Sequence, residues 1–176
     1  IMLNISIIDG YVDEPTCLGV PPYISPYPRY IAGAIWKFDK NIKINYLTID
    51  KIRKNKSCLD ILNKSDLIIT IAGISVPGKY LGGIHAGPYE LVSLLSNISK
   101  PIKVLCGPAA KYGFGISGGK ETKETDFVKE TFDLIIKGDG ETVISNFLKN
   151  KLNIDNIDNT QCRKSASSIG DFAVIG

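Results

Sequence analysis

The stretch "LIITIA", from Leu67 to Ala72, is uncharged and rich in β-branched side chains. A continuous apolar run of this length is typical of a strand that is buried on both faces of a sheet. Similar runs recur along the chain. We therefore expect five strands, at Leu3–Ile8, Ile42–Ile49, Asp66–Ala72, Ile102–Cys106 and Asp133–Lys137.

Helical patterns lie between and after these runs. We expect helices at Arg29–Phe38, Ile52–Asn63, Tyr89–Ile98, Glu124–Thr131 and Glu141–Lys149. Strand and helix alternating five times predict a five-stranded parallel sheet with helices on both faces and right-handed crossovers. The expected fold class is thus α/β, doubly wound and flavodoxin-like or Rossmann-like.

Composition limits the kinds of partner that the chain is expected to have. The 176 residues suit one domain, with 44% apolar and 22% charged residues and a net charge of +3. The densest basic stretch, Lys51–Lys56, is typical of a solvated helix face, so we expect no nucleic-acid partner. No apolar run is long enough to span a bilayer and no signal peptide precedes the first strand, which predicts a cytoplasmic protein without a membrane partner.

The cysteines and the last segment of the chain give further expectations. Cys17, Cys58, Cys106 and Cys162 form no CxxC pair and no metal-ligand spacing, so we expect free thiols and no metal site. Residues 1–150 form the expected α/β domain. Residues 151–176 are polar and aperiodic, as in a linker or strap, and their apolar ending "DFAVIG" favours a fragment whose C-terminal domain is missing.

The expected binding site follows from the sheet. In open parallel sheets, ligands bind outside the carboxyl ends of the strands. Three of the segments there are long for such connections and rich in Gly, Pro and Tyr, which favours function over the alternative of ordered loops that cover the sheet edge. The segments are residues 9–28, "DGYVDEPTCLGVPPYISPYP", residues 72–88, "AGISVPGKYLGGIHAGP", residues 106–120, "CGPAAKYGFGISGGK", and the short turn "KGDGE" at 137–141.

Catalytic motifs are weak in these segments. Gly113–Gly118 reads GxGxxG, but it follows the fourth strand after an intervening "GPAAKY", and Gly119-Lys120 fails as a P-loop. His85 suits capping or packing better than metal binding, and neither Ser75 nor Ser117 lies in a GxSxG elbow. The acids Asp13 and Glu14 are commonplace in a loop. The sequence therefore indicates a domain that holds a ligand rather than a self-sufficient catalyst.

The "KGDGE" turn is the most compact candidate. Its glycines, Gly138 and Gly140, allow a ligand to approach the backbone closely. Glu141 favours a helix N-terminus and is able to accept hydrogen bonds from a bound polar group. A plain strand-to-helix turn with an acidic first residue is the alternative interpretation.

Three motifs in this order resemble a known family. The chain has "PYISPYPRYIAGAIWK" leading into the first helix, "CGPAA" after the fourth strand and "KGDGE" after the fifth. This arrangement, over roughly residues 3–150, resembles the N-terminal cobalamin-binding domain of B12-dependent radical SAM enzymes, and residues 9–30 look most like an archaeal branch of that family. The Asp-x-His-x-x-Gly motif, with which methionine-synthase-type domains place a histidine on cobalt, is absent, as it generally is in the radical SAM branch.

The resemblance implies a function and a set of binding residues. It implies cobalamin bound base-off, without a protein histidine on cobalt, in a chain that alone is not catalytic. S-adenosylmethionine and a [4Fe–4S] cluster are expected only in the missing C-terminal radical SAM domain, which would be the partner of this domain in a methyltransferase. The residues implied for cofactor binding are Asp9, Gly10, Tyr11, Pro22, Tyr23, Tyr27, Pro28, Tyr30, Gly73, Ile74, Ser75, Gly107, Pro108, Ala109, Gly138, Asp139, Gly140 and Glu141.

Two other functions remain open from the sequence. A flavodoxin-like regulatory or flavin- or nucleotide-binding module would use the loop Gly113–Gly119 to hold a phosphate. A ligand-free interaction domain would use its Tyr- and Pro-rich first loop to bind a partner.

Overall fold

One parallel sheet of five strands organises the chain. The structure, a computed structural model, describes residues 3–11, 27–73, 85–114 and 125–157. The strand order is β2-β1-β3-β4-β5, and every neighbouring pair is parallel. The strands are β1 (Asn4–Asp9), β2 (Lys43–Thr48), β3 (Leu67–Ile71), β4 (Ile102–Cys106) and β5 (Leu134–Ile135).

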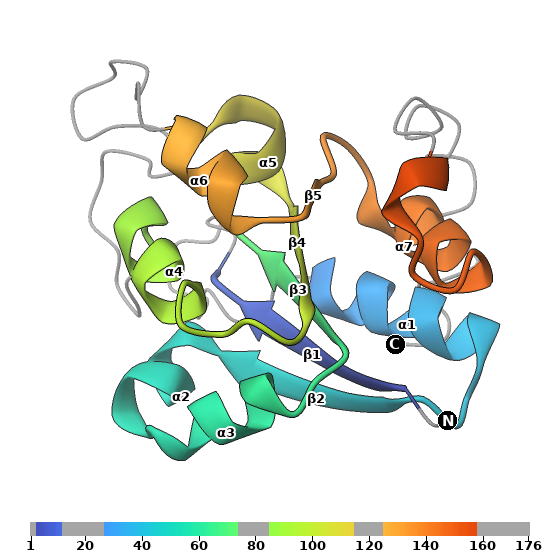
Figure 1. Cartoon of the computed structure of the whole chain (residues 1–176), viewed down its shortest axis with the longest axis horizontal. Helices are drawn as coiled ribbons and strands as arrows, with labels where there is room; N and C mark the ends of the chain where they lie inside the picture. The colour runs from blue at the N-terminus through green and yellow to red at the C-terminus, as the bar shows by residue number, and fades with distance from the viewer. Residues whose placement is uncertain (1–2, 12–26, 74–84, 115–124, 158–176) are drawn as a thin grey trace, which may run out of the picture.

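The helices lie on both faces of this sheet. They are α1 (Tyr27–Phe38), α2 (Ile49–Lys54), α3 (Ser57–Asn63), α4 (Pro88–Leu95), α5 (Pro108–Tyr112), α6 (Thr125–Thr131) and α7 (Gly140–Lys149), with a 3₁₀ turn, η2, at Ile154–Asn156. Helices α1 and α7 pack side by side on one face, whereas α2, α3 and α4 cover the other (Figure 1). The predicted doubly wound α/β fold is confirmed, and the order 2-1-3-4-5 is the flavodoxin-like one.

Strand alternation divides the core between the two faces. In β1, Ile5 and Ile7 point to the α1/α7 face, while Ile8 joins the core beneath α2, α3 and α4. All five side chains of β3 are buried. This burial on both faces explains why the run in β3 is continuously apolar instead of alternating.

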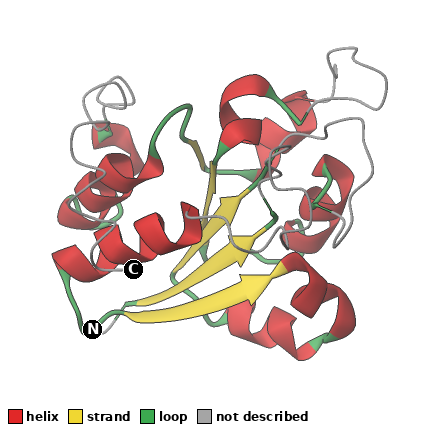
Figure 2. Ribbon diagram, turned by 180° about the vertical axis from the view of Figure 1, so that it is seen from behind, coloured by secondary structure: helices red, strands yellow, loops and turns green. Residues whose placement is uncertain are grey.

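Parallel pairing brings all the strand ends to one edge. Seen from behind, the strand arrows end on the same side of the molecule (Figure 2). The backbone continues the register past the strands, since Gly10 N–H donates to the Ile71 carbonyl at 2.8 Å and Ala72 N–H donates to the Cys106 carbonyl at 3.1 Å. The segments that follow β1, β3 and β4 therefore start from neighbouring positions.

The sequence predicted one continuous helix at Ile52–Asn63. This prediction is wrong, because the structure has two helices there. Asn55 leaves the helical conformation, with φ −135° and ψ 105°, and ends α2. Its side-chain oxygen accepts the backbone N–H of Ser57 at 2.9 Å, which starts α3. Asparagine competes with helical hydrogen bonds in this way, so a pattern of apolar residues alone does not reveal the break.

Two further differences concern the strand ends. The segment after β4, expected as an irregular loop, begins with the short helix α5, with Pro108 in its first turn. The fifth strand spans only Leu134–Ile135, although Asp133 and Ile136 extend its pairing through hydrogen bonds of 2.9 Å to Lys103 and Leu105. The start of the expected strap, at Leu152 and Ile157, packs on the α1/α7 core. The rest of that segment lies outside the described residues.

Gly107 allows β4 to turn into α5 directly against β3. Its φ is +90° and ψ −175°, a region occupied almost only by glycine. A Cβ at this position would lie 2.8 Å from the Ala72 carbonyl oxygen, which accepts the Ala109 N–H at 3.0 Å. The close approach and the backbone conformation both require glycine here.

We predict that Gly107→Ala destabilises the chain more than Gly113→Ala does. Gly113 has a similar conformation, with φ 82° and ψ 171°, but an added Cβ would meet nothing within 4 Å. Gly113→Ala should therefore cost only the backbone strain, about 1–3 kcal/mol, while Gly107→Ala should add about 1–3 kcal/mol from overpacking. Urea unfolding measures both. Equal losses in the two variants would contradict the close approach to Ala72.

Candidate functional site

A hollow lies at the carboxyl edge of the sheet on the α1/α7 face. Its volume is about 180 Å³, and its walls come from the start of α1, the ends of β3 and β4, helix α5 and the turn from β5 into α7. In the view of Figure 1, α1 and α7 lie on the same side of the sheet, and α5 follows the end of β4. Segments more than a hundred residues apart in sequence thus form one site.

The hollow brings together the three motif segments. Seven residues named from the sequence line it: Tyr27, Gly107, Pro108, Gly138, Asp139, Gly140 and Glu141. Five lining residues were not predicted: Ile31, Ile71, Cys106, Lys111 and Tyr112. Ile71 and Cys106 end their strands on the α1/α7 face, so strand parity was the available signal for them. Lys111 and Tyr112 enter the wall because the segment after Gly107 is helical.

The turn into α7 packs closely against α1. A Cβ added at Gly140 would lie 2.8 Å from the Cδ1 atom of Ile31 and 3.6 Å from the Cβ of Cys106. The glycine therefore lets the first turn of α7 approach both α1 and the end of β4. This contact positions the next side chain, Glu141, at the wall of the hollow.

Glu141 is the buried carboxyl group of the hollow. The residue is 3% exposed, and its Oε2 atom has no hydrogen-bond partner among the described residues. Burial raises the pKa of Glu141, a hydrogen bond with its own backbone N–H opposes that rise, and the nearby charge of Asp139 adds to it. A buried polar atom without a partner is costly, so such an atom in a hollow marks a place where a ligand is able to bind.

Cys106 supplies a neutral wall beside this carboxyl group. Its Sγ atom lies 3.6 Å from the Thr70 carbonyl oxygen, to which the thiol donates. Burial, followed by the charge of Glu141, raises the pKa of the thiol. Because a nucleophilic cysteine requires the thiolate, Cys106 suits packing in this site and not nucleophilic chemistry.

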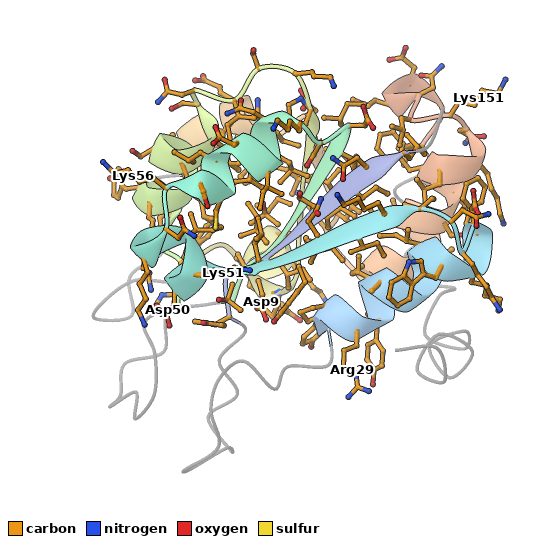
Figure 3. The ribbon with its side chains drawn as sticks, turned by 90° about the horizontal axis from the view of Figure 1, so that it is seen from below. Asp9, Arg29, Asp50, Lys51, Lys56 and Lys151 are labelled. Atoms are coloured by element: carbon orange, nitrogen blue, oxygen red, sulfur yellow. The ribbon has the colours of Figure 1, made fainter. Side chains whose placement is uncertain are left out.

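A second polar group lies at the end of β1. Asp9 is fully buried and accepts the hydroxyl of Tyr46 at 2.5 Å and the backbone N–H of Tyr11 at 3.0 Å. Burial raises the pKa of Asp9, and these two hydrogen bonds oppose the rise. Figure 3 shows Asp9 next to Asp50 at the start of α2, with Arg29 at the start of α1 on the same side of the molecule.

Tyr11 turns away from the hollow. Its φ is 62°, an uncommon value for a residue other than glycine, and its side chain is buried in the core beneath α2 and α4. The tyrosine hydroxyl donates to Asp50 Oδ2 at 3.2 Å. Tyr11 therefore joins β1 to α2 on the face opposite α1 and α7.

The other residues named from the sequence lie apart from the hollow or outside the described part of the chain. Pro28 and Ala109 are buried within α1 and α5, Gly73 is buried after β3, and Tyr30 is half-buried on α1. None of these four, nor Asp9, Gly10 or Tyr11, lines the hollow. Pro22, Tyr23, Ile74 and Ser75 lie outside the described residues, as does the glycine loop beyond Phe114.

His85 lies on the α2/α4 side of the sheet and does not line the hollow. Its backbone carbonyl accepts Arg53 Nη2 at 3.3 Å, and Arg53 also bridges Asp50 at 2.9 Å and Glu90 at 2.6 Å. These ion pairs connect α2 with α4. Arg53, a basic residue of the stretch Lys51–Lys56, therefore has acidic partners within the chain.

The described residues offer neither a metal-binding cluster nor a membrane-spanning helix. In ranges 3–11, 27–73, 85–114 and 125–157, no three His, Cys, Asp or Glu side chains gather in a way that could hold a metal ion. Within the same ranges, no helix has both the length and the apolar character needed to cross a membrane.

Fold and site together define an α/β domain with a hollow at the carboxyl edge of a flavodoxin-like sheet. An uncharacterized protein of Methanocaldococcus jannaschii is 43% identical over 171 residues, which cover 97% of this chain but 30% of that protein. An uncharacterized protein of Archaeoglobus fulgidus is 52% identical over 92 residues, which cover 52% of this chain and 17% of that protein. The chain thus spans less than a third of these archaeal relatives. No protein-family model and no solved structure matches it.

We predict that Asp9→Asn makes the free energy of unfolding depend less strongly on pH. Asp9 and Glu141 both have a pKa raised in the folded chain, so the folded state binds more protons than the unfolded state above about pH 4. Their contribution to the free energy of unfolding therefore falls as pH rises from about 4 through the raised pKa values, and is constant above them.

Chemical unfolding across this pH range measures the effect. The difference in unfolding free energy between Asp9→Asn and the unaltered chain should shift in favour of the variant as pH rises. Asp60→Asn, which removes an exposed carboxyl of α3, controls for the loss of one carboxylate. A difference for Asp9→Asn that stays constant with pH would contradict the raised pKa of Asp9.

Proposed function

We propose that this chain is a cobalamin-binding domain that holds the cofactor base-off, with no histidine of the protein on cobalt. In this proposal the nucleotide tail enters the hollow beside α1 and α7, and the corrin ring lies over the carboxyl edge of the sheet. The proposal rests on the motifs of the sequence and on where their described residues lie.

One observation carries it. Tyr27 from the segment that leads into α1, Gly107 and Pro108 from "CGPAA", and Gly138–Glu141 from "KGDGE" line the same hollow. Each of these segments is recognisable in the sequence by its own motif. A common ligand explains why residues so far apart in the chain carry related motifs and meet at the ligand-binding edge.

The residues of the hollow fit part of such a ligand. Its volume of about 180 Å³ is below the roughly 300–1,000 Å³ of pockets that enclose a whole drug-sized molecule, so it suits one group of a larger ligand. Ile31, Ile71 and Cys106 supply apolar wall, and the buried Glu141 offers an unused hydrogen bond. This combination suits a flat heterocycle, such as the benzimidazole base at the end of the tail.

The sequence supports the histidine-free form. Its single histidine is His85, which follows β3 and not β1. The sequence after β1 reads Asp9-Gly10-Tyr11, without the histidine motif that ligates cobalt in other cobalamin domains.

The residues of this chain bind and orient the cofactor. The tail would be held by the walls of the hollow, with Glu141 at the polar group and the glycines allowing close approach of the backbone. Cobalamin, when bound, supplies a cobalt centre that carries a methyl group. The remainder of a longer protein would supply S-adenosylmethionine and a [4Fe–4S] cluster, as in a radical SAM methyltransferase.

We predict that the purified chain retains a corrinoid. It is mixed with hydroxocobalamin and desalted, and the visible spectrum is recorded, with riboflavin 5′-phosphate in a parallel sample. We expect a base-off corrin spectrum that is unchanged in His85→Ala. A folded chain that retains no corrin would refute the proposal, and retained flavin would favour the flavodoxin-like alternative. A histidine-ligated spectrum that disappears in His85→Ala would overturn the histidine-free form.

The longer relatives allow a second prediction that needs no protein. If the domain serves a radical SAM enzyme, the parts of the two archaeal relatives that lie outside the matched region should contain CxxxCxxC, the motif whose cysteines bind the cluster. Reading those sequences decides the question. Absence of the motif from both would remove the radical SAM part of the proposal and leave the cobalamin part to the binding experiment.

A further inference from the structure

The buried carboxyl group of Glu141 is more than a wall of the hollow. The residue is 3% exposed, its Oε2 atom has no partner among the described residues, and it lies in the first turn of α7, a helix of ten residues. Its side chain lines the hollow. A glutamate that served only the fold would have its oxygens paired within the chain.

The charges around the hollow favour a proton on this group. Asp139 precedes it in the same turn, and Cys106 faces it from β4 as a neutral thiol. Tyr27 on α1 and Tyr112 on α5 also line the hollow. Lys111, the cation of the lining, is exposed, with its Nζ atom 4.9 Å from the centre of the Tyr112 ring.

We propose that Glu141 binds a ring nitrogen of an uncharged, planar heterocyclic base through a proton that the carboxyl group keeps inside the hollow. Glu141 then selects ligands that carry such a nitrogen over those that lack it. The inference rests on the proposed function, because it assigns the base of the cobalamin tail as the group that enters the hollow. It adds that Glu141 binds the base and that this contact requires one proton.

The chemistry of the wall favours an uncharged, planar heterocyclic base as the bound group. A carboxyl group that keeps its proton donates one hydrogen bond, and a ring nitrogen with a free lone pair accepts it. Ile31, Ile71 and Cys106 give the hollow an apolar surface against which a flat ring is able to pack. An anionic group would lie beside Asp139 and Glu141 without a buried cation in the described lining, which disfavours phosphate in this position.

Because Glu141 and the base share one proton, the affinity for the base should change with pH in one direction. Above the pKa that burial has raised, Glu141 loses its proton in the free chain and must regain it when the base binds. The affinity for the base should therefore fall with rising pH, by up to about tenfold per pH unit, because one proton is taken up per ligand. A ligand that lacks the base should show no such dependence.

The test compares cobalamin with cobinamide, which has the same corrin but no nucleotide base. Dissociation constants for both are measured by visible absorbance between about pH 6 and pH 9, a range in which benzimidazole and purine bases stay uncharged. The experiment uses the unaltered chain, Glu141→Gln, Glu141→Met and the control Glu130→Gln. Glu130 is an exposed glutamate of α6 that does not line the hollow.

We expect cobalamin to bind at least tenfold more tightly than cobinamide near pH 6, and this advantage to shrink as pH rises. Glu141→Gln, whose amide N–H donates at every pH, should keep the advantage and lose its pH dependence. Glu141→Met should lose the advantage, and Glu130→Gln should behave like the unaltered chain. Thermal unfolding without ligand shows that each variant is folded.

The possible failures are distinct. If neither corrinoid binds the folded chain, the proposed function fails and the inference fails with it. If both bind equally at every pH, or if Glu141→Met keeps the full advantage of cobalamin, the domain still binds corrinoids but Glu141 does not bind the base. If the advantage of cobalamin grows with pH, Glu141 acts as an anion and the shared proton is wrong.

Discussion

Parallel pairing of strands that are buried on both faces is the constraint on which this structure depends. Because β1, β3 and β4 carry apolar side chains on both faces, each needs a helix on either side. A parallel strand also cannot return through a tight turn, so each connection crosses the sheet and every strand ends at the same edge. At this edge the ends of β3 and β4 and the start of α7 line the hollow together with the start of α1.

At that edge, two glycines let helices approach their neighbours closely. Gly107 brings the start of α5 against Ala72, and Gly140 brings α7 against Ile31. Among the described residues, two carboxyl groups are buried at this edge, and they differ in their hydrogen-bond partners. Asp9 receives a tyrosine hydroxyl and a backbone N–H, which makes it part of the fold, whereas Glu141 keeps one oxygen without a partner among the described residues. Because of this difference, Glu141 is the better candidate for contact with a ligand.

The sequence predicted the fold well and the site in part. All five strands followed from apolar runs, and their parallel pairing followed from the alternation of strands with helices. The motifs after the fourth and fifth strands supplied six of the residues that line the hollow. The break at Asn55 was missed because one side-chain hydrogen bond to Ser57 decides it. Cys106 was missed although strand parity indicated its face, and Lys111 was missed because helix α5 was not expected. Tyr11 was named for its place after β1, yet its positive φ turns the side chain to the opposite face.

By itself the sequence determined the class of fold, the edge at which a ligand is expected and the motifs that lie there, since these depend on local patterns of apolar, glycine and proline residues. Only the tertiary structure decided which motif residues meet. The reason is that strand order and helix packing bring together Tyr27, Gly107 and Glu141, whose separation in the chain carries no information on distance. The tertiary structure also decided that Glu141 is buried with an unpartnered oxygen, because burial and hydrogen bonding are set by neighbours from α1, β4 and α5.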